Sequence, residues 1–432
     1  MIEKIEFEGF KYIDGGVCAA QGFKANGVHC GLAHQPLSDS EKNSAESNNA
    51  LPTSKNKKDL AVIIADKECS AAAVYTTNKV KGAPIQVTRQ NISDGKARGV
   101  IVNSVNANTC NADGVEKAEK MCQLAANEFG LKSSDFIVAS TGVIGQVLPI
   151  EPIEKAMPEL CKNVSNKGNS AAVEAIMTTD TVPKEIAIEF EMGGKKCVMG
   201  GMLKGSGMIH PNMATTLTFI TTDAAVSSEY LKHALSDVVK TTLNMVSVDG
   251  DTSTNDMVSI MANGMAGNSE IKSDNEDFAE FENALYVVMV NLARMMARDG
   301  EGATKLIECV CTGADSVETA RKIAKSVITS NLFKAAMFGE DANWGRILCA
   351  IGYADADFDI NKVDVDIVSA AGKIEVCRFG AGASFSEDKA KEILKEEEIT
   401  VLVTIGKGEF SAAAWGCDLT YDYVKINGDY RS

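Results

Sequence analysis

Histidine, tryptophan and proline are scarce in this sequence, and no long apolar run is present. The 432 residues include 4 histidines, 2 tryptophans and 8 prolines. With so few histidines, a catalytic triad or a metal centre built on imidazole is weakly supported. No stretch approaches the roughly 18 uncharged apolar residues that cross a bilayer, so we expect no transmembrane helix.

The cysteines follow no recognisable pairing pattern. There are 12 of them, without a CxxC motif, and they are single residues apart from Cys309 and Cys311 in a predicted strand. This favours buried reduced thiols over a disulfide framework or a zinc site. His29, Cys30 and His34 lie close together, but their spacing matches no metal-binding motif. We therefore predict no metal.

Acidic side chains outnumber basic ones. The 59 carboxylates and 43 cationic side chains give a formal net charge of −16. Such a surface repels nucleic acids and anionic membranes, so we expect neither as a partner. The first 16 residues are acidic and polar, unlike a signal or transit peptide, and the expected location is the cytoplasm.

The length exceeds that of one ordinary hydrophobic core and predicts two domains or two entwined halves. An apolar fraction of 45% and a charged fraction of 24% are typical of a soluble globular protein. Residues 38–58 are rich in Ser, Asn and Lys and nearly free of large apolar side chains. Such a segment buries too little surface to offset its ordering entropy, so we predict a flexible surface insert.

Strands and helices are predicted to alternate irregularly. Short apolar runs rich in β-branched residues predict strands at 60–65, 71–77, 99–104, 136–140, 217–222, 306–311, 363–368, 373–379 and 400–405. Helical spacing of apolar residues predicts helices at 113–129, with Gly130 as C-cap, from about Ser228, at 276–298 and at 318–330. This order predicts a mixed α/β fold of layered sheets covered by helices, and not a doubly wound parallel sheet.

The most unusual segment is GGMLKGSGMIHPNMATTLTFITTDA, residues 200–224. Glycines at 200, 201, 205 and 207 are expected to allow backbone conformations that other residues resist. Pro211 fixes φ shortly before the predicted strand. A strained turn against a rigid strand is a suitable place to hold a nucleophile.

Two other interpretations of this segment were weighed. A phosphate loop is not favoured, because the chain has no GxxxxGK[ST] motif and His210 stands where a third glycine would be required. The segment can also be a plain glycine-rich turn before a strand, with Thr215 and Thr216 as β-forming residues. Composition alone leaves that second interpretation open.

A resemblance to a known family favours chemistry. Lys204 to Thr215 read KGSGMIHPNMAT, which resembles the KGSGMIxPNMAT hallmark of the bifunctional ornithine acetyltransferase/N-acetylglutamate synthase family. Further segments resemble that family in its own order along nearly the whole chain: VYTTNKVKGAP (74–84), STGVIGQVLP (140–149), MTTDTVPKE (177–185), RDGEGATK (298–305), KAAMFGEDANWGRI (334–347) and INGDYRS (426–432). The chain departs from the family pattern at Val105, where glycine is expected, and in its longer 38–58 insert.

The resemblance implies self-cleavage between Ala214 and Thr215. The products would be an alpha chain, 1–214, and a beta chain, 215–432, which jointly form an N-terminal-nucleophile-like fold. A threonine hydroxyl needs an adjacent base. The new α-amine, with an ordinary pKa of about 7.7–8.0, would supply one.

The resemblance also implies the roles of the site residues. Thr141 and Gly142 would form the oxyanion hole, although this pair can also be a strand-ending turn. The substrate-binding residues would be Thr178, Lys204, Thr215, Glu301, Asn427 and Ser432. Lys204 suits an α-carboxylate and Glu301 suits the cationic ornithine side chain. The alternatives are a solvated loop carboxylate at Glu301 and a frayed terminus at the last two residues.

The implied reaction moves the acetyl group of N2-acetylornithine to glutamate through acetyl-Thr215, giving ornithine and N-acetylglutamate in arginine biosynthesis. No cofactor is needed, and acetyl-CoA as a second acetyl donor is left open. The implied assembly is a heterotetramer of two alpha and two beta chains. The alternatives are a self-cleaving amidohydrolase or aminopeptidase, and a non-catalytic amino-acid sensor.

Overall fold

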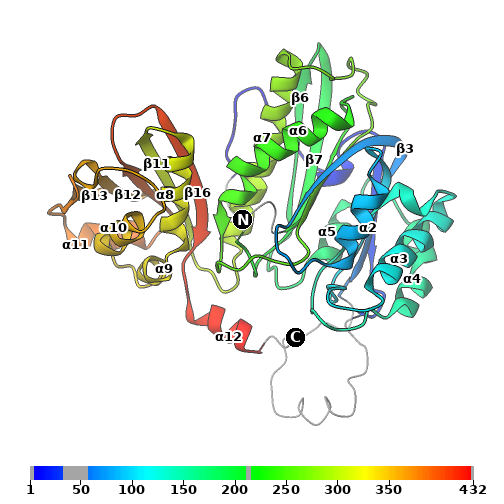
Figure 1. The fold of residues 1–432 in the computed structure, drawn as a ribbon, viewed down its shortest axis with the longest axis horizontal. Helices are drawn as coiled ribbons and strands as arrows, with labels where there is room; N and C mark the ends of the chain where they lie inside the picture. Colours follow the sequence, from blue (N-terminus) through cyan, green and yellow to red (C-terminus); the bar gives the residue numbers. More distant parts are fainter. Residues whose placement is uncertain (1–3, 33–56, 211–215, 430–432) are drawn as a thin grey trace, which may run out of the picture.

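The computed structural model describes residues 4–32, 57–210 and 216–429 (Figure 1). Several predicted features lie outside these ranges: most of the 38–58 insert, His34, Pro211, Ala214, Thr215 and Ser432.

Within the described ranges, nine strands form one sheet in the order β1-β6-β7-β8-β10-β3-β4-β5, with β2 paired to β3. Its strands are β1 (Lys11–Ile13), β2 (Phe23–Val28), β3 (Leu60–Tyr75), β4 (Lys96–Asn103), β5 (Phe136–Ser140), β6 (Lys184–Met192), β7 (Lys195–Lys204), β8 (Leu217–Thr222) and β10 (Met257–Ala262). The strands predicted at 60–65 and 71–77 are one element, β3, which pairs with β2 and β4 in its first part and with β10 in its second.

A second sheet has seven strands in the order β14-β13-β12-β15-β11-β16-β9. These are β9 (Val246–Ser247), β11 (Leu306–Ala314), β12 (Asp364–Ser369), β13 (Gly372–Arg378), β14 (Ala381–Gly382), β15 (Glu398–Thr404) and β16 (Phe410–Cys417). Parallel and antiparallel pairs are mixed in both sheets, since β11 runs parallel to β15 and antiparallel to β16.

The described ranges contain eleven α-helices, most of which cover the faces of the two sheets. They are α2 (Ala83–Asn91), α3 (Gly114–Phe129), α4 (Ile150–Lys162), α5 (Asn169–Ile176), α6 (Ser228–Thr241), α7 (Glu276–Arg298), α8 (Val317–Thr329), α9 (Asn331–Phe338), α10 (Trp344–Gly352), α11 (Glu387–Leu394) and α12 (Tyr421–Asp429). Single 3-10 turns lie at Gly16–Cys18, Ser133–Asp135, Leu243–Met245 and Ile360–Lys362.

Local signals explain where several helices begin and end. The Ser227 side chain accepts a hydrogen bond from the Tyr230 N–H and begins α6, and Asn275 begins α7 in the same way. Gly130 ends α3 in the left-handed conformation, with φ 66°, as predicted for a glycine C-cap.

Helix α7 lies between the two sheets and joins their cores. It packs on β6 and β7 of the first sheet and on β11 and β16 of the second (Figure 1). One apolar core therefore runs from Ile188 in β6 through Val288 in α7 to Val401 in β15. A separate core lies under α3 and α4 against β3, β4 and β5. The prediction of a mixed α/β fold with layered sheets covered by helices is confirmed.

The first sheet is built from both sides of the 214–215 bond. β8 follows that bond in sequence, yet it is paired with β7, which precedes it, and with β10. β10 in turn pairs with β3 from the first half of the chain. The two sides of the bond are thus entwined in one sheet.

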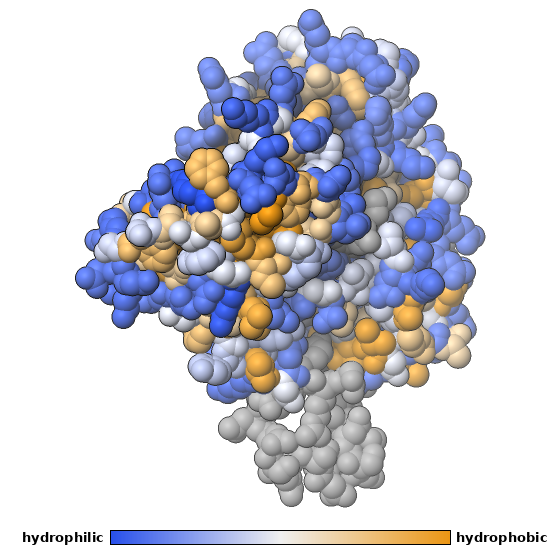
Figure 2. Space-filling model, turned by 60° about the vertical axis from the view of Figure 1, so that its left-hand side comes forward, coloured by the Kyte–Doolittle hydropathy of each residue, from blue (hydrophilic) through white to orange (hydrophobic). Residues whose placement is uncertain are grey.

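The surface is largely hydrophilic on the face shown in Figure 2, where apolar residues form separate patches. Some large apolar side chains are well exposed, including Leu332 at 61%, Tyr421 at 84% and Val424 at 67%. None of the helices in the described residues is long and apolar enough to span a membrane. Nine of the twelve cysteines are buried and all are unpaired, as the sequence predicts for reduced core thiols.

Candidate active site

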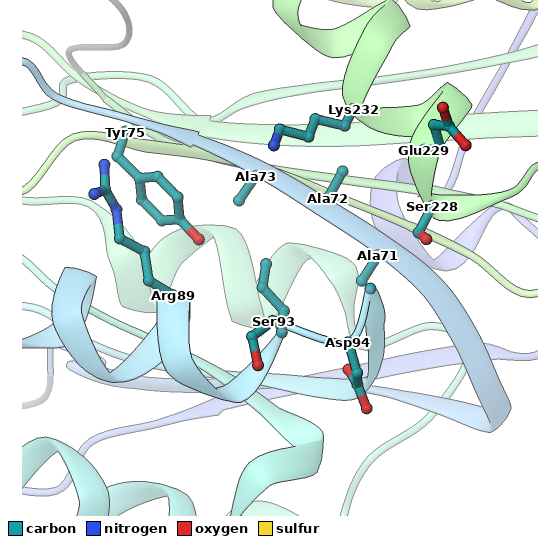
Figure 3. Close-up of a pocket in the computed structure, with 12 residues that line it drawn as sticks. Ala71, Ala72, Ala73, Tyr75, Arg89, Ser93, Asp94, Ser228, Glu229 and Lys232 are labelled. Carbon is teal, nitrogen blue, oxygen red and sulfur yellow. The ribbon is translucent and has the colours of Figure 1, made fainter.

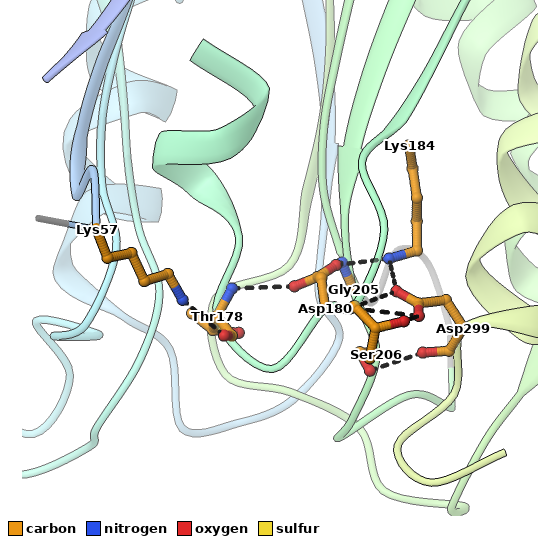
Figure 4. Close-up of polar contacts among 8 residues, drawn as sticks. Lys57, Thr178, Asp180, Lys184, Gly205, Ser206 and Asp299 are labelled. Carbon is orange, nitrogen blue, oxygen red and sulfur yellow. Dashed lines mark hydrogen bonds and ion pairs between the residues drawn. The ribbon is translucent and has the colours of Figure 1, made fainter. Parts of the chain in front are cut away.

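A buried lysine stands at the centre of the polar contacts beside the end of β7. Lys184 Nζ lies 2.7 Å from Asp180 Oδ1 and also forms an ion pair with Asp299 (Figure 4). The Lys184 side chain is fully buried, and so is that of Asp180. Two carboxylates around one cation are tolerable inside a protein only because each charge is compensated and hydrogen-bonded.

Asp180 connects this lysine to two backbone segments. Its carboxylate accepts hydrogen bonds from the Thr178 N–H at 3.0 Å and the Gly205 N–H at 2.8 Å. Burial raises the pKa of Asp180, but the nearby Lys184 and Lys204 ammonium groups outweigh it and hold that pKa below its ordinary value. Asp180 is therefore ionised and fixes the loop that carries Thr178.

Asp299 completes the connection to the end of α7. Its carboxylate accepts hydrogen bonds from the N–H and hydroxyl of Thr181, and its carbonyl accepts one from the Ser206 hydroxyl at 2.7 Å. The Glu301 N–H then donates to the Ser206 carbonyl at 3.0 Å. Three segments that sequence analysis predicts to bind substrate, carrying Thr178, Lys204 and Glu301, are thereby held together.

The Glu301 side chain is buried against Gly207. A Cβ atom at Gly207 would lie 2.1 to 2.3 Å from the Glu301 carboxyl atoms, so a side chain there would displace the Glu301 carboxyl group from this position. Asn427 Nδ2 in α12 donates a hydrogen bond to Glu301 Oε2 at 2.7 Å. Glu301 is 8% exposed, so the interpretation of a solvated loop carboxylate is wrong. The Asn427 contact also argues against a frayed α12.

The glycines of the 200–207 segment serve a purpose other than the predicted one. Positive φ angles were expected there, and the structure places none of these four glycines in that region. A Cβ at Gly200 would lie 1.8 Å from the Gly16 carbonyl oxygen, so this glycine is required by close packing of two backbones. Met208, directly after these glycines, does have the left-handed conformation, with φ 58°. Asp249 holds it by accepting a hydrogen bond from the Met208 N–H at 2.7 Å.

His210, the last described residue before the gap, is poorly suited to act as a general base. Its Nδ1 lies 3.1 Å from the Ser247 hydroxyl, and its carbonyl accepts a hydrogen bond from the Thr252 hydroxyl at 2.9 Å. Burial, with a contribution from Lys325, lowers the pKa of His210 to about 4. The imidazole is therefore neutral and structurally engaged near pH 7, in line with the weak support for a histidine triad.

Strand β8 starts beside a buried carboxyl group. The Met257 N–H at the start of β10 donates to the Thr216 carbonyl at 2.8 Å, and Asp256 directly precedes Met257. Among the described residues, Asp256 Oδ2 has no hydrogen-bond partner. Burial raises the pKa of Asp256 well above its ordinary value, against the opposing effects of Ser253 and Lys204. A buried carboxyl group with a raised pKa thus lies beside the residue that follows Thr215.

Thr141 and Gly142 follow β5 in a tightly constrained turn. Gly142 has φ 130°, and a Cβ there would lie 2.1 Å from the Val105 carbonyl, so only glycine fits. Val105 itself has φ 80°, a conformation that favours the glycine expected at this position. The Thr141 N–H is bound to the Asn103 carbonyl at 3.0 Å. The Gly142 N–H and the Thr141 hydroxyl donate no hydrogen bond to any other described residue. Both donors can therefore meet a substrate oxygen.

Asn255 ties this turn to the start of β10. Its side-chain amide donates to the Ser140 carbonyl at 2.9 Å and to the Ala107 carbonyl at 2.6 Å. β10 pairs in parallel with β8 through Met257 and Leu217. The Thr141–Gly142 turn and the strand that begins two residues after Thr215 therefore share one rigid support.

Two cavities open elsewhere in the described part of the molecule. One, of about 460 Å³, lies between β3, α2 and α6, with the Arg89 guanidinium 4.6 Å from the centre of the Tyr75 ring and Lys232 nearby (Figure 3). The other, of about 560 Å³, is lined in part by Thr181 and Asp299. The first cavity contains none of the predicted site residues. The second adjoins the Lys184 network, since Thr181 and Asp299 line it.

Sequence reasoning missed several residues that organise this region. Asp180, Lys184 and Asp299 stand inside segments that resemble the family, but they were given no role. A signal was available only for Asp299, which directly follows the helix predicted at 276–298, since a charge next to an apolar element is costly to bury without partners. Lys57 and Asn255 had no such signal, because their contacts depend on distant segments of the chain.

Comparisons with known proteins give relatives that match most of the chain. A family model described as the ArgJ family matches residues 45–432. Arginine biosynthesis bifunctional protein ArgJ 1 of Clostridium acetobutylicum is 51% identical over 382 residues, which is 87% of this chain and 93% of that protein. Arginine biosynthesis bifunctional protein ArgJ of Caldanaerobacter subterraneus is 46% identical over 421 residues, 97% and 99% of the two chains. A crystal structure of ornithine acetyltransferase with ornithine from Mycobacterium tuberculosis is 30% identical, covers 48% of this chain and 100% of that one, and gives a TM-score of 0.39.

Proposed function

The chain belongs to the ArgJ family, and on that premise we propose that it transfers the acetyl group of N2-acetylornithine to glutamate through an acetyl ester on Thr215. The observation that carries this proposal is the convergence of segments on the connection between β7 and β8. The Lys184 network holds the segments of Thr178, Lys204 and Glu301 at one end of that connection. Asn255 holds the Thr141–Gly142 turn at its other end.

The first step is self-cleavage between Ala214 and Thr215. The Thr215 hydroxyl attacks the Ala214 carbonyl, and the peptide bond is exchanged for an ester as the Thr215 nitrogen takes up a proton. This shift frees the α-amine of Thr215. Water then hydrolyses the ester, which gives back the Thr215 hydroxyl and leaves a carboxylate on Ala214. The halves are residues 1–214 and 215–432, and the amine provides the base that a threonine nucleophile needs.

The second step moves the acetyl group onto the enzyme. The Thr215 hydroxyl attacks the acetyl carbonyl of N2-acetylornithine while its own α-amine accepts the proton. Negative charge develops on the carbonyl oxygen, and the Thr141 hydroxyl and Gly142 N–H are the two donors that meet it. Ornithine leaves with the proton, and the amine of glutamate then attacks the ester to give N-acetylglutamate.

Substrate is held by charges whose arrangement supports amino-acid binding. Lys204 is 9% exposed and would pair with an α-carboxylate. The charge-assisted hydrogen bonds between the two groups would offset the cost of removing both from water. Glu301, oriented by Asn427, would bind the cationic side chain of ornithine. Ser432 and the Thr178 hydroxyl complete the proposed contacts.

The proposal extends to assembly and location. We assign a heterotetramer of two alpha and two beta chains in the cytoplasm, without a cofactor. Acetyl-CoA as a second donor is tested directly by incubating the protein with acetyl-CoA and glutamate. N-acetylglutamate formed without N2-acetylornithine would make the protein bifunctional in that sense.

The intact mass of the purified protein tests the proposed reaction. Two fragments divided before Thr215 are expected, and the 215–432 fragment should gain one acetyl group after N2-acetylornithine is added. If the cleaved protein releases free acetate as fast as it releases ornithine, even with glutamate present, the protein is instead an amidohydrolase. A chain that stays uncut after prolonged incubation would contradict the mechanism.

Removing one oxyanion donor should slow the acetyl transfer without preventing folding. We expect Thr141→Val to lower kcat by about 10²- to 10³-fold, since one hydrogen bond to the developing oxyanion is lost. Thr141→Ser, which keeps the hydroxyl group, is the matched control and should stay within about tenfold of the wild type on the same scale. Equal rates for T141V and the wild type in a steady-state assay would remove Thr141 from the oxyanion hole.

A further inference from the structure

Lys57 lies among the charges of the candidate site, although neither the family hallmark nor the proposed mechanism gives it a role. Its ammonium group donates a hydrogen bond to the Thr178 carbonyl at 2.7 Å (Figure 4). Thr178 is one of the proposed substrate-binding residues, so the ammonium group of Lys57 stands at the wall of that site. The residue is half-buried.

The electrostatic surroundings of Lys57 mark it as part of the site. Burial lowers the pKa of its ammonium group and Lys204 adds to the lowering, while Asp180, Asp59 and Glu174 oppose it. Lys57 and Lys204 are thus two cations near one another and near Asp180. A partly desolvated cation beside another cation gains more from an incoming carboxylate than a solvated lysine does.

The ammonium group of Lys57 has capacity for such a ligand. An ammonium group offers three hydrogen-bond donors. Among the described residues, one of them is used, by the Thr178 carbonyl. Asp180, a buried carboxylate that acts on the Lys57 charge, is already occupied by Lys184 and by two backbone N–H groups.

The proposed reaction creates a need for a second cation. The donor, N2-acetylornithine, ends in an ammonium group, whereas the acceptor, glutamate, ends in a carboxylate. Glu301 attracts the first and repels the second, because like charges at short range are unfavourable. Lys204 is committed to the α-carboxylate that both molecules carry. The glutamate side chain therefore requires a separate positive partner.

The described contacts place Lys57 and the Ser206–Glu301 segment on different sides of Asp180. Figure 4 shows Lys57 and Thr178 on one side of Asp180 and Gly205, with Ser206 and Asp299 on the other. Glu301 continues from that second end, through its N–H to the Ser206 carbonyl. Lys57 can thus meet a carboxylate on one side, and Glu301 an ammonium group on the other.

We propose that Lys57 binds the side-chain carboxylate of the acceptor and so selects an acidic amino acid for the second half of the reaction. This inference rests on the proposed function. Lys57 acts only after ornithine has left, and the donor half-reaction does not use it. Glu301 and Lys57 thereby serve substrates of opposite side-chain charge in one site.

The test compares Lys57→Met with Lys58→Met in the cleaved enzyme. Lys58 is the matched control, since it is adjacent in sequence and pairs with Glu174 at the surface, 2.7 Å away. We expect K57M to raise the KM for glutamate by about 10- to 100-fold, the loss typical of a charge-assisted hydrogen bond. The rate at which N2-acetylornithine acetylates Thr215, measured by intact mass, should stay within about twofold of the wild-type rate. K58M should match the wild type in both half-reactions.

Two further measurements separate charge recognition from a merely structural role. Lys57→Arg should restore most of the affinity for glutamate. Glutamine, the uncharged isostere, should be a poor acceptor for the wild type, and K57M should lose most of its preference for glutamate over glutamine. If K57M slows both half-reactions equally, or keeps the full preference for glutamate, the inference is overturned. A wild-type enzyme that forms no acetyl-threonine overturns the proposed function itself, which the mass measurement reveals separately.

Discussion

Replacing Thr215 with alanine is expected to leave the 432-residue chain in one piece and to abolish acetyl transfer. The alanine variant has no hydroxyl group to attack the Ala214 carbonyl, so the α-amine that serves as the base is never released. Nucleophile and base are lost together, and we expect kcat to fall by at least about 10³-fold. Denaturing gel electrophoresis shows the uncut chain, and ornithine release measures the activity.

Two controls make this result specific. Thr215→Ser keeps a hydroxyl group and should still be cut and retain part of the activity. Thr216→Val removes the neighbouring hydroxyl, which contacts Thr218 within β8, and should leave both cleavage and transfer in place. A T215A protein that is still cut between 214 and 215, or a T216V protein that is not, would move the nucleophile away from Thr215.

Replacing Lys184 with methionine is expected to produce the largest loss of stability among single substitutions at the site. The change removes a fully buried cation and leaves Asp180 and Asp299 without their shared partner. Removing one partner of a buried ion pair costs about 3–5 kcal/mol, because the remaining charge stays buried and uncompensated. Activity should fall as well, since the segments of Thr178 and Glu301 lose their common anchor. Denaturant unfolding followed by circular dichroism measures the free energy of unfolding.

The pH dependence of this loss follows from Asp180. In the wild type its folded pKa lies below the unfolded value, so its stabilising contribution is present above the unfolded pKa and is lost as pH falls through the folded one. Without Lys184, burial would dominate and raise the folded pKa of Asp180. The penalty in K184M would then shrink toward acidic pH, as protonation neutralises the buried carboxylate.

A surface lysine provides the comparison. Lys196 pairs with Glu189 at 3.0 Å, and its side chain is 70% exposed. Lys196→Met should change the unfolding free energy by less than about 1 kcal/mol, as is usual for exposed ion pairs. Similar losses for K184M and K196M, or a K184M penalty that grows at low pH, would contradict this account of the network.

Elements with strong local signals could be predicted from the sequence. The predicted bounds of β5, β8 and α7 agree with the structure, because each is an uninterrupted apolar or periodic run between clear breaks. Strand β7 was not predicted. It begins with two lysines and contains Gly200 and Gly201, a composition that favours a loop. Its strand structure depends on pairing with β6 and β8 on either side.

The site could be predicted only in part, and the reason is again distance along the chain. The family resemblance indicated segments around Thr178, Lys204 and Glu301, and the structure brings these segments together. What joins them is Lys184, whose ion pair with Asp299 spans 115 residues of sequence. No local pattern encodes such a contact. The glycines were misjudged for the same reason, since the atoms that crowd Gly200 belong to Gly16.

The placement of β8 between β7 and β10 has a consequence for how the two proposed fragments would be produced and handled. A cut before Thr215 severs one covalent bond but leaves the hydrogen-bonded ladders on both sides of β8 intact. Dilution would therefore not release the fragments, and separating them would require denaturing the sheet. Each fragment expressed alone would present unpaired strand edges, which invite aggregation. Recombinant production thus calls for one uncut gene, with the cut made after the sheet has closed.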